Sequence, residues 1–152
     1  MSNSIDAQSN IEKSDSLWPI GCNLVAHEIT TGIWVTTQWQ LTGFELKPES
    51  HHNHVVTLQL FRDERTDYRF NLSSQNPKLF VVLENVEETP KITTISASQS
   101  VAGQYMDGDY LVLSCEMPLP IQAWMEAFIG RHGELLEERR KKRKGAGRAS
   151  GN

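Results

Sequence analysis

Three histidines crowd one short stretch of the chain, at positions 51, 52 and 54. Imidazole nitrogens are common metal ligands, and His52 and His54 would project from the same face if a strand began early enough to include them. No cysteine or carboxylate lies beside them at a ligand-like spacing, and proline and serine flank the stretch. The pattern therefore favours a solvated loop, and we predict no metal site here.

A second ionisable cluster lies between positions 62 and 69, where paired carboxylates would be the starting point for acid–base catalysis. Its acidic residues are Asp63, Glu64 and Asp67, and its basic residues are Arg62, Arg65 and Arg69. Mixed charge between two predicted strands is typical of a solvated turn. We therefore assign no catalytic role to this cluster.

The segment Asp107-Gly108-Asp109-Tyr110 resembles the start of a calcium loop but lacks the remaining oxygen ligands. It is better explained as the end of a short helix, with Gly108 as its cap. No glycine-rich phosphate loop and no Gly-x-Ser-x-Gly motif occurs in the chain. The sequence therefore predicts no catalytic residue and no cofactor.

Cys22 and Cys115 are the only cysteines, so the chain builds neither a disulfide framework nor a four-cysteine metal site. Both follow apolar segments, and we predict that both are buried structural thiols. Among the four tryptophans, Trp34 and Trp39 have opposite parity on one predicted strand. At least one of them should point away from the core unless both faces of the strand are covered, and an outward tryptophan would be a candidate for an interface or a ligand. Core packing is the favoured interpretation of the tryptophans.

The residues that we expect to bind a partner form an uninterrupted basic run: Arg139, Arg140, Lys141, Lys142, Arg143 and Lys144. Residues 131–152 hold eight basic and three acidic residues, a net charge of +5, whereas the whole chain has −4, so residues 1–130 carry −9. Three interpretations stay open for the run: a solvated helix, a docking segment for an acidic protein surface, and a nucleic-acid-binding segment. The absence of interleaved aromatic residues counts against nucleic acid.

The elements that would position these residues are mostly strands joined by short turns. Alternating or β-branched segments predict strands at residues 23–29, 33–41 with an extension past Gly43, 54–62, 67–73, 79–83, 92–95 and 110–115. Strands without intervening helices indicate an antiparallel arrangement. We expect one sheet or partial barrel of about six to seven strands.

Two helical patterns interrupt or follow the strands. Ser96 and Gln99 form a capping-box pattern that predicts a short helix over residues 97–107. After Pro120, apolar residues recur at helical spacing: Ile121, Trp124, Met125, Phe128 and Ile129. Glycines at 130 and 133 then separate this amphipathic helix from a charged helix that begins at Glu134, so the predicted fold class is α+β.

The composition predicts three parts: a disordered tail at residues 1–16, a single α+β domain at 17–133, and a charged helix with a flexible basic tail at 134–152. No apolar run approaches the roughly 20 residues that span a bilayer. The first residues also lack the basic and apolar regions of a signal peptide. We therefore expect a cytoplasmic protein.

Several segments of the chain resemble a proteobacterial family of unknown function. The resemblance is carried by Tyr68-Arg69-Phe70-Asn71-Leu72-Ser73-Ser74 and Pro77-Lys78-Leu79-Phe80-Val81-Val82-Leu83. It continues through Ser96-Ala97-Ser98, Tyr105-Met106-Asp107-Gly108, Met117-Pro118, Trp124, Phe128, His132 and the basic run, and so covers roughly residues 33–144.

Members of that family are often encoded beside molybdenum-dependent formate dehydrogenases, and some are labelled as molybdopterin-guanine dinucleotide biosynthesis proteins. The resemblance implies a non-enzymatic accessory protein for formate dehydrogenase assembly or cofactor delivery, with a dehydrogenase subunit or another accessory protein as its partner. An enzyme of molybdopterin-guanine dinucleotide metabolism is one alternative, although the glycine-rich nucleotide loop of a transferase is absent. A nucleic-acid-binding protein that uses the basic tail is the other.

Overall fold

A long first strand organises the molecule, because it pairs with different strands at its two ends. The computed structural model describes residues 12–84, 86, 89–106 and 109–133. The elements in chain order are β1 (Leu17–Thr31), β2 (Trp34–Glu45), β3 (Val55–Gln59), the 3-10 turn η1 (Arg62–Glu64), α2 (Arg65–Leu72), β4 (Lys78–Glu84), β5 (Lys91–Ser96), α3 (Gln99–Gly103), β6 (Leu111–Glu116) and α4 (Leu119–His132).

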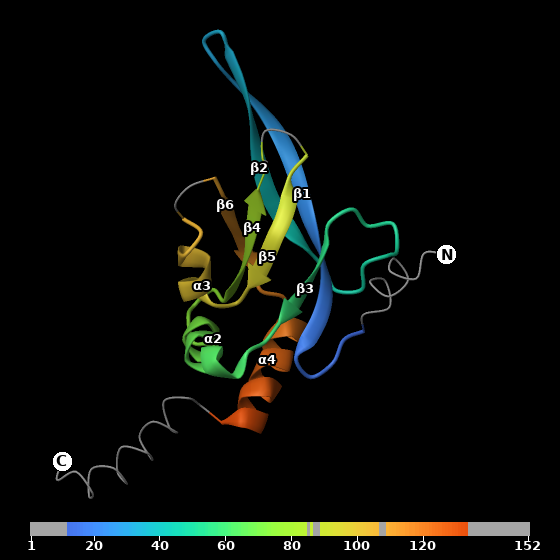
Figure 1. Cartoon of the computed structure of the whole chain (residues 1–152), viewed down its shortest axis with the longest axis vertical. Coiled ribbons are helices and arrows are strands. Elements are labelled where there is room, and N and C mark those ends of the chain that lie inside the picture. Colours follow the sequence, from blue (N-terminus) through green and yellow to red (C-terminus); the bar gives the residue numbers. More distant parts are fainter. Residues whose placement is uncertain (1–11, 85, 87–88, 107–108, 134–152) are drawn as a thin grey trace, which may run out of the picture.

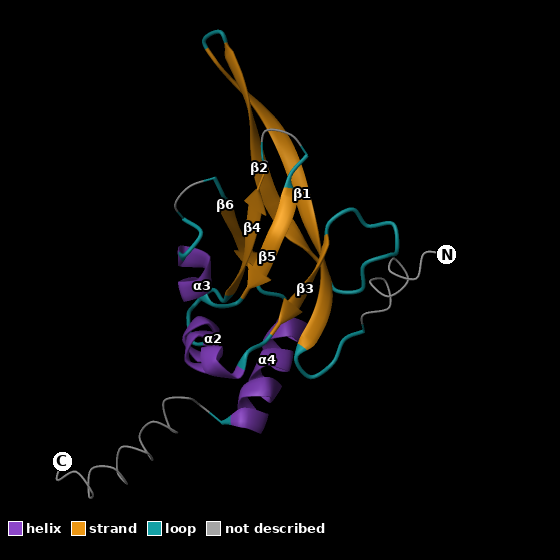
Figure 2. Cartoon of the chain, in the orientation of Figure 1, coloured by secondary structure: helices purple, strands orange, loops and turns teal. Residues whose placement is uncertain are grey.

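The strands form two antiparallel three-stranded sheets, with orders β2-β1-β3 and β5-β4-β6 (Figure 2). β3 pairs only with the first residues of β1, from Leu17 to Gly21, whereas β2 pairs with β1 from Gly21 outward. The α+β class is confirmed, but the expected single sheet or partial barrel is wrong, because neither sheet closes. The sheets meet by packing of β3 on β5 and of β2 on β6.

The predicted strand at residues 67–73 is wrong, because this segment lies in helix α2. The alternation of Tyr68, Phe70 and Leu72 has the period of a strand. However, Arg65, Tyr68 and Leu72 also lie three and four residues apart, and these are the side chains that turn inward, leaving Phe70 75% exposed. A short apolar run fits both periods, and here packing against α4 selects the helix.

The predicted capping box at Ser96 is also wrong. Ser96 belongs to β5, and the N-cap of α3 is Ser98, whose Oγ accepts a hydrogen bond from the backbone N–H of Val101 at 3.1 Å. The helix is shorter than predicted and ends at Gly103. The predicted strand at 54–62 is shorter as well, since Arg62 begins η1. Gly108, the predicted helix cap, lies outside the described residues.

The prediction of an amphipathic helix after Pro118 is confirmed by α4. All five predicted apolar residues, Ile121, Trp124, Met125, Phe128 and Ile129, are buried. The helix lies across the end of the strands (Figure 1). It continues through Gly130 and ends at His132, and the next residue, Gly133, has a φ of 75° that is accessible to glycine at little cost.

The segment before β1 is packed along α4. The indole N–H of Trp124 donates to the backbone oxygen of Ser14 at 2.7 Å, and Arg131 Nε lies 3.8 Å from Asp15 Oδ2. Contacts with α4 therefore begin before Leu17, at Ser14 and Asp15. The rest of the predicted tail, residues 1–11, lies outside the described residues.

Candidate functional site

The most exposed regular structure is the outer part of the β1–β2 hairpin, which extends well beyond the rest of the molecule (Figure 1). We call residues 25–38 the arm. Every arm residue is exposed, whereas Cys22 and Leu41 at its base are buried. Both faces of this two-stranded ribbon are therefore accessible to solvent or to a partner.

Local sequence explains why the arm forms. Thr31 pairs with Trp34, so Gly32 and Ile33 are the loop, and Gly32 has a φ of 64° that suits a tight hairpin turn. At the base, Asn23 pairs with Gly43 but Leu24 pairs with Leu41, which leaves Thr42 as the extra residue of a bulge. A bulge bends and twists its strand, so it sets the direction in which the arm leaves the body.

The arm carries exposed apolar side chains on both faces and at its tip. The register places Val25, Ile29 and Trp34 on one face and Val35 on the other. Trp34 is 71% exposed, Ile33 88% and Val35 60%. Trp39, of opposite parity, is half-buried and donates from its indole N–H to the carbonyl of Val86 at 2.8 Å. The prediction that one of these tryptophans points outward is thus confirmed.

Charge is depleted along the arm. Glu28 is the one Asp, Glu, Lys or Arg residue of the arm, although these types make up 22% of the whole chain. His27 Nε2 lies 2.9 Å from Gln40 Oε1 across the ribbon. Depletion of charge together with exposed aromatic and aliphatic side chains is the composition of a protein-interface core. The sequence signals of this site were the Ile33-Trp34-Val35 run at a turn and the nearly uncharged stretch around it.

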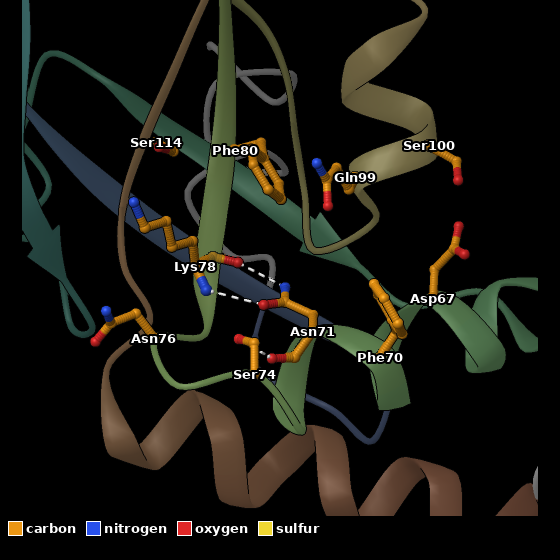
Figure 3. A pocket seen from close by; sticks show the side chains of 10 residues that line it. All are labelled: Asp67, Phe70, Asn71, Ser74, Asn76, Lys78, Phe80, Gln99, Ser100 and Ser114. Carbon is orange, nitrogen blue, oxygen red and sulfur yellow. Dashed lines mark hydrogen bonds between the residues drawn. The ribbon is translucent and has the colours of Figure 1, made fainter.

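A second candidate is a pocket of about 550 Å³ on the outer face of the β5-β4-β6 sheet (Figure 3). Residues from α2, β4, β6 and the first turn of α3 line it, with Phe70 and Phe80 as its aromatic members. Asn71 fixes its lower edge, since its amide donates to the carbonyl of Lys78 at 2.7 Å and accepts from the N–H of Lys78 at 2.9 Å. Sequence reasoning missed this pocket, although two segments that carry the family resemblance border it.

The ionisable cluster at residues 62–69 is a structural joint, which corrects the predicted solvated turn. Arg65 is only 3% exposed. Its Nε donates to the carbonyl of Arg62 at 2.5 Å, and its Nη1 donates to the carbonyls of His132 and Gly133. A cation at the C-terminal end of α4 satisfies carbonyls that the helix leaves unpaired and complements its dipole.

The acidic members of the cluster are also held by neighbours. Tyr68 Oη donates to Glu64 Oε1 at 2.8 Å and accepts from the N–H of Phe61 at 2.9 Å. Burial raises the pKa of the Glu64 carboxyl above its ordinary value, and the hydrogen bond from Tyr68 opposes that effect. Ser98 Oγ donates to Asp67 Oδ2 at 2.7 Å. These contacts join α2 to its neighbours.

The histidines occupy three different environments. His51 is exposed and lies 3.2 Å from a Glu49 oxygen, whereas the half-buried His52 accepts from the N–H of His54 and lies 3.3 Å from Asn23 Oδ1. Burial, and secondarily the charge of His52, lowers the pKa of His54. The predicted solvated loop therefore holds only for His51. Across the described ranges, no group of three or more His, Cys, Asp or Glu side chains is arranged to hold a metal ion.

The remaining predicted residues divide between the core and the masked ends of the chain. Cys22 is buried as predicted, and burial raises its thiol pKa to about 12, so it stays protonated at neutral pH. Cys115 is half-buried instead. The basic run from Arg139 to Lys144 and the Asp107-Gly108 pair lie outside the described residues. No helix in the described part is long and apolar enough to cross a membrane.

Comparison with known proteins gives one match. A family model described as "Protein of unknown function (DUF3305)" matches residues 23–144, which include the arm and both borders of the pocket. No curated protein and no solved structure matches the chain. Because the match spans most of its length, this chain belongs to the DUF3305 family.

Proposed function

We propose that this protein is a non-enzymatic accessory protein that docks onto another protein through its arm, residues 25–38. The observation that carries the proposal is the exposure of Ile33, Trp34 and Val35 at the end of a ribbon that stands away from the core. Large apolar side chains gathered at a projecting tip cost solvation free energy unless a partner covers them. Tryptophan is also the residue type most enriched among energetic hot spots of interfaces.

The low stability expected of a two-stranded ribbon also supports a binding partner for the arm. A two-stranded hairpin is marginally stable in water when it lacks a packed face. Among the described strands, none adds a third strand to the arm, because β3 pairs with β1 only before Cys22. Within the described residues the arm is therefore ordered by the pairing of β1 with β2, and binding would add the missing packed face.

The partner that fits is a different protein with an uncharged, apolar cleft that receives the tip and both faces of the ribbon. A second copy of this chain fits less well. With strands that rise about 3.4 Å per residue and lie about 4.8 Å apart, one face of the arm covers on the order of 300 Å². A stable interface needs about 800 Å² on each partner, so two arms laid face to face bury too little.

The family resemblance supplies a candidate for the partner: a subunit of molybdenum-dependent formate dehydrogenase, or another accessory protein of its assembly. The basic run from Arg139 to Lys144 stays a prediction for the steering of that partner toward an acidic surface. The alternatives of a molybdopterin-guanine dinucleotide enzyme and a nucleic-acid-binding protein stay predictions too, since no described residue favours either.

The test compares two variants with matched exposure in their substituted side chains. The double variant Ile33→Ser/Trp34→Ser replaces the two apolar side chains of the tip. The control, Leu119→Ser, replaces an apolar side chain that is 76% exposed at the start of α4. Binding of each protein to purified formate dehydrogenase subunits is measured by titration calorimetry, and formate dehydrogenase activity is measured in cells that carry each variant.

We expect the tip variant to fold normally, to bind at least tenfold more weakly, and to lower dehydrogenase activity, with the Leu119→Ser protein unchanged. Equal binding by the tip variant and the wild type would show that the tip of the arm does not bind this partner. Concentration-dependent dimerisation that the tip variant abolishes would assign the arm to self-association instead.

A further inference from the structure

The pocket between α2, α3 and the β5-β4-β6 sheet has features of a small-molecule site that is separate from the arm. We propose that it binds a small planar aromatic ring that carries an anionic group. Its volume of about 550 Å³ lies within the range of roughly 300–1,000 Å³ that is usual for ligand pockets.

The floor of the pocket is a sheet face that the helices leave partly uncovered. Phe80 on β4 pairs with Ser114 on β6, and Lys78 lies on the same face two residues earlier. Leu79 and Val81 point to the opposite face, where both are fully buried in the core. Phe80 is only half-buried, so part of its ring faces the pocket.

Phe70 is the second aromatic residue of the pocket and extends from α2. It is 75% exposed, although it stands in a helix whose neighbouring Tyr68 is almost fully buried. Two phenylalanines at one pocket offer faces or edges against which a planar ring would stack.

Hydrogen bonds hold the walls in place before any ligand arrives. Asn71 on α2 binds both backbone groups of Lys78 and also donates to the carbonyl of Ala97 at 2.9 Å. Ser98, which is fully buried, donates to Asp67 on α2 and accepts from Val101 on α3. Because α2, β4 and α3 are tied together by these side chains, a ligand would order little of the protein on binding.

The polar lining defines the chemistry of the ligand. Figure 3 shows Asp67 and Ser100 at one end of the pocket and Lys78 with Asn76 at the other, with Gln99 beside Phe80. Lys78 is the one cation among the lining residues, so it is the group that would bind an anion. Gln99 and Ser100 offer donors and acceptors for the edge of a ring. A purely aliphatic ligand would cover these groups without giving them partners.

The experiment uses matched ring pairs with the full-length protein: adenosine with adenosine monophosphate, and indole with indole-3-acetate, with inorganic phosphate alone as a further probe. Binding is followed by saturation-transfer NMR and by titration. The variants are Phe70→Ala and Lys78→Ala, whose side chains make no core contact. Their controls are Phe61→Ala, a phenylalanine 44% exposed elsewhere, and Lys91→Ala outside the pocket. Thermal melting confirms that each variant folds.

We expect at least one anionic member to bind saturably and more tightly than its neutral counterpart. Phe70→Ala should weaken both members of that pair by about tenfold, the upper range for an aromatic contact. Lys78→Ala should abolish the preference for the anionic member, and both control variants should bind like the wild type. Absence of saturable binding across both pairs overturns the proposal. Binding that Phe70→Ala leaves unchanged, or phosphate binding as tight as that of the nucleotide, overturns it as well.

Discussion

At the scale of single residues, Arg65 shows how a charged side chain becomes part of a core. A buried guanidinium is costly unless its donors are satisfied, and here carbonyls at the end of α4 and the carbonyl of Arg62 accept from it. The carbonyls of His132 and Gly133 belong to residues that the sequence places far from Arg65. The side chain therefore fixes α2 against the end of α4.

Glu64 provides a test of the same joint through the pH dependence of stability. Its pKa is raised above the ordinary value of 4.5, chiefly by burial, so the folded state holds its proton more tightly than the unfolded state. The folded state is therefore favoured at low pH, and this contribution is lost as the pH rises from about 4.5 through the folded-state pKa.

Glu64→Gln should consequently melt at the same or a higher temperature than the wild type at pH 7, because it keeps an acceptor for Tyr68 and removes the buried charge. The difference should vanish near pH 4, where the wild-type carboxyl is itself protonated. Thermal melts over this pH range measure it. A variant less stable than the wild type at pH 7 would show that the charge of Glu64 stabilises the joint.

At the scale of elements, α4 joins the first strand to helix α2. Trp124 packs edge-on against Trp18 of β1 with 5.3 Å between ring centroids, and Phe128 packs on Tyr68 of α2 at 6.3 Å. Its side chains thus contact both the first strand and the helix that follows the first sheet. The helix covers one end of the core, where apolar side chains of the strands would otherwise be exposed.

Trp124→Ala should lower the free energy of unfolding by about 3–5 kcal/mol, the cost of emptying a large aromatic site in a core. The loss of the hydrogen bond to Ser14 adds to the cavity. Leu119→Ala, at an exposed position of the same helix, is the control and should change stability little. Urea denaturation measures both. Wild-type-like unfolding of the Trp124→Ala protein would contradict the packing of α4.

At the scale of the whole molecule, the net charge and the arm act on different steps of binding. Residues 131–152 carry +5 against −9 for the rest of the chain, so they attract an acidic partner over a distance. In the proposed binding, the arm, with Glu28 as its one acidic residue, contributes after the encounter, by burial. Charge at the rim of an interface changes chiefly the association rate, whereas buried anchors change chiefly the dissociation rate.

Reversal of charge at Lys141, Lys142, Arg143 and Lys144 to glutamate should therefore leave melting unchanged. If formate dehydrogenase subunits are the partner, as proposed, it should slow association with them, and the slowing should diminish as salt is added. Surface plasmon resonance measures the rates, and a variant with lysine and arginine exchanged at these four positions is the charge-preserving control. If cells that contain the charge-reversed protein at normal abundance keep full dehydrogenase activity, the basic run serves only solubility.

The sequence by itself determined the elements whose signal is local. The face of α4, most strands and the opposite directions of Trp34 and Trp39 follow from residue spacing, because side-chain direction repeats with a fixed period in a helix or a strand. Which of the two tryptophans is exposed came only from the structure. Burial of Cys22 followed from its apolar neighbours. Family membership also follows from the sequence, since the matched residues extend over both sheets.

Only the tertiary structure decided what depends on contacts between distant segments. The division into two sheets depends on β1 pairing with β3 at its start and with β2 farther along. The periodicity of the sequence does not show this change of partner. Helix α2 forms in place of the predicted strand because Arg65 donates a hydrogen bond at the end of α4 and Tyr68 packs on a ring of α4. The pocket exists because Asn71 and Asp67 tie three elements around a half-covered Phe80. Such hydrogen bonds join residues far apart in the chain, so their geometry arises only when the chain has folded.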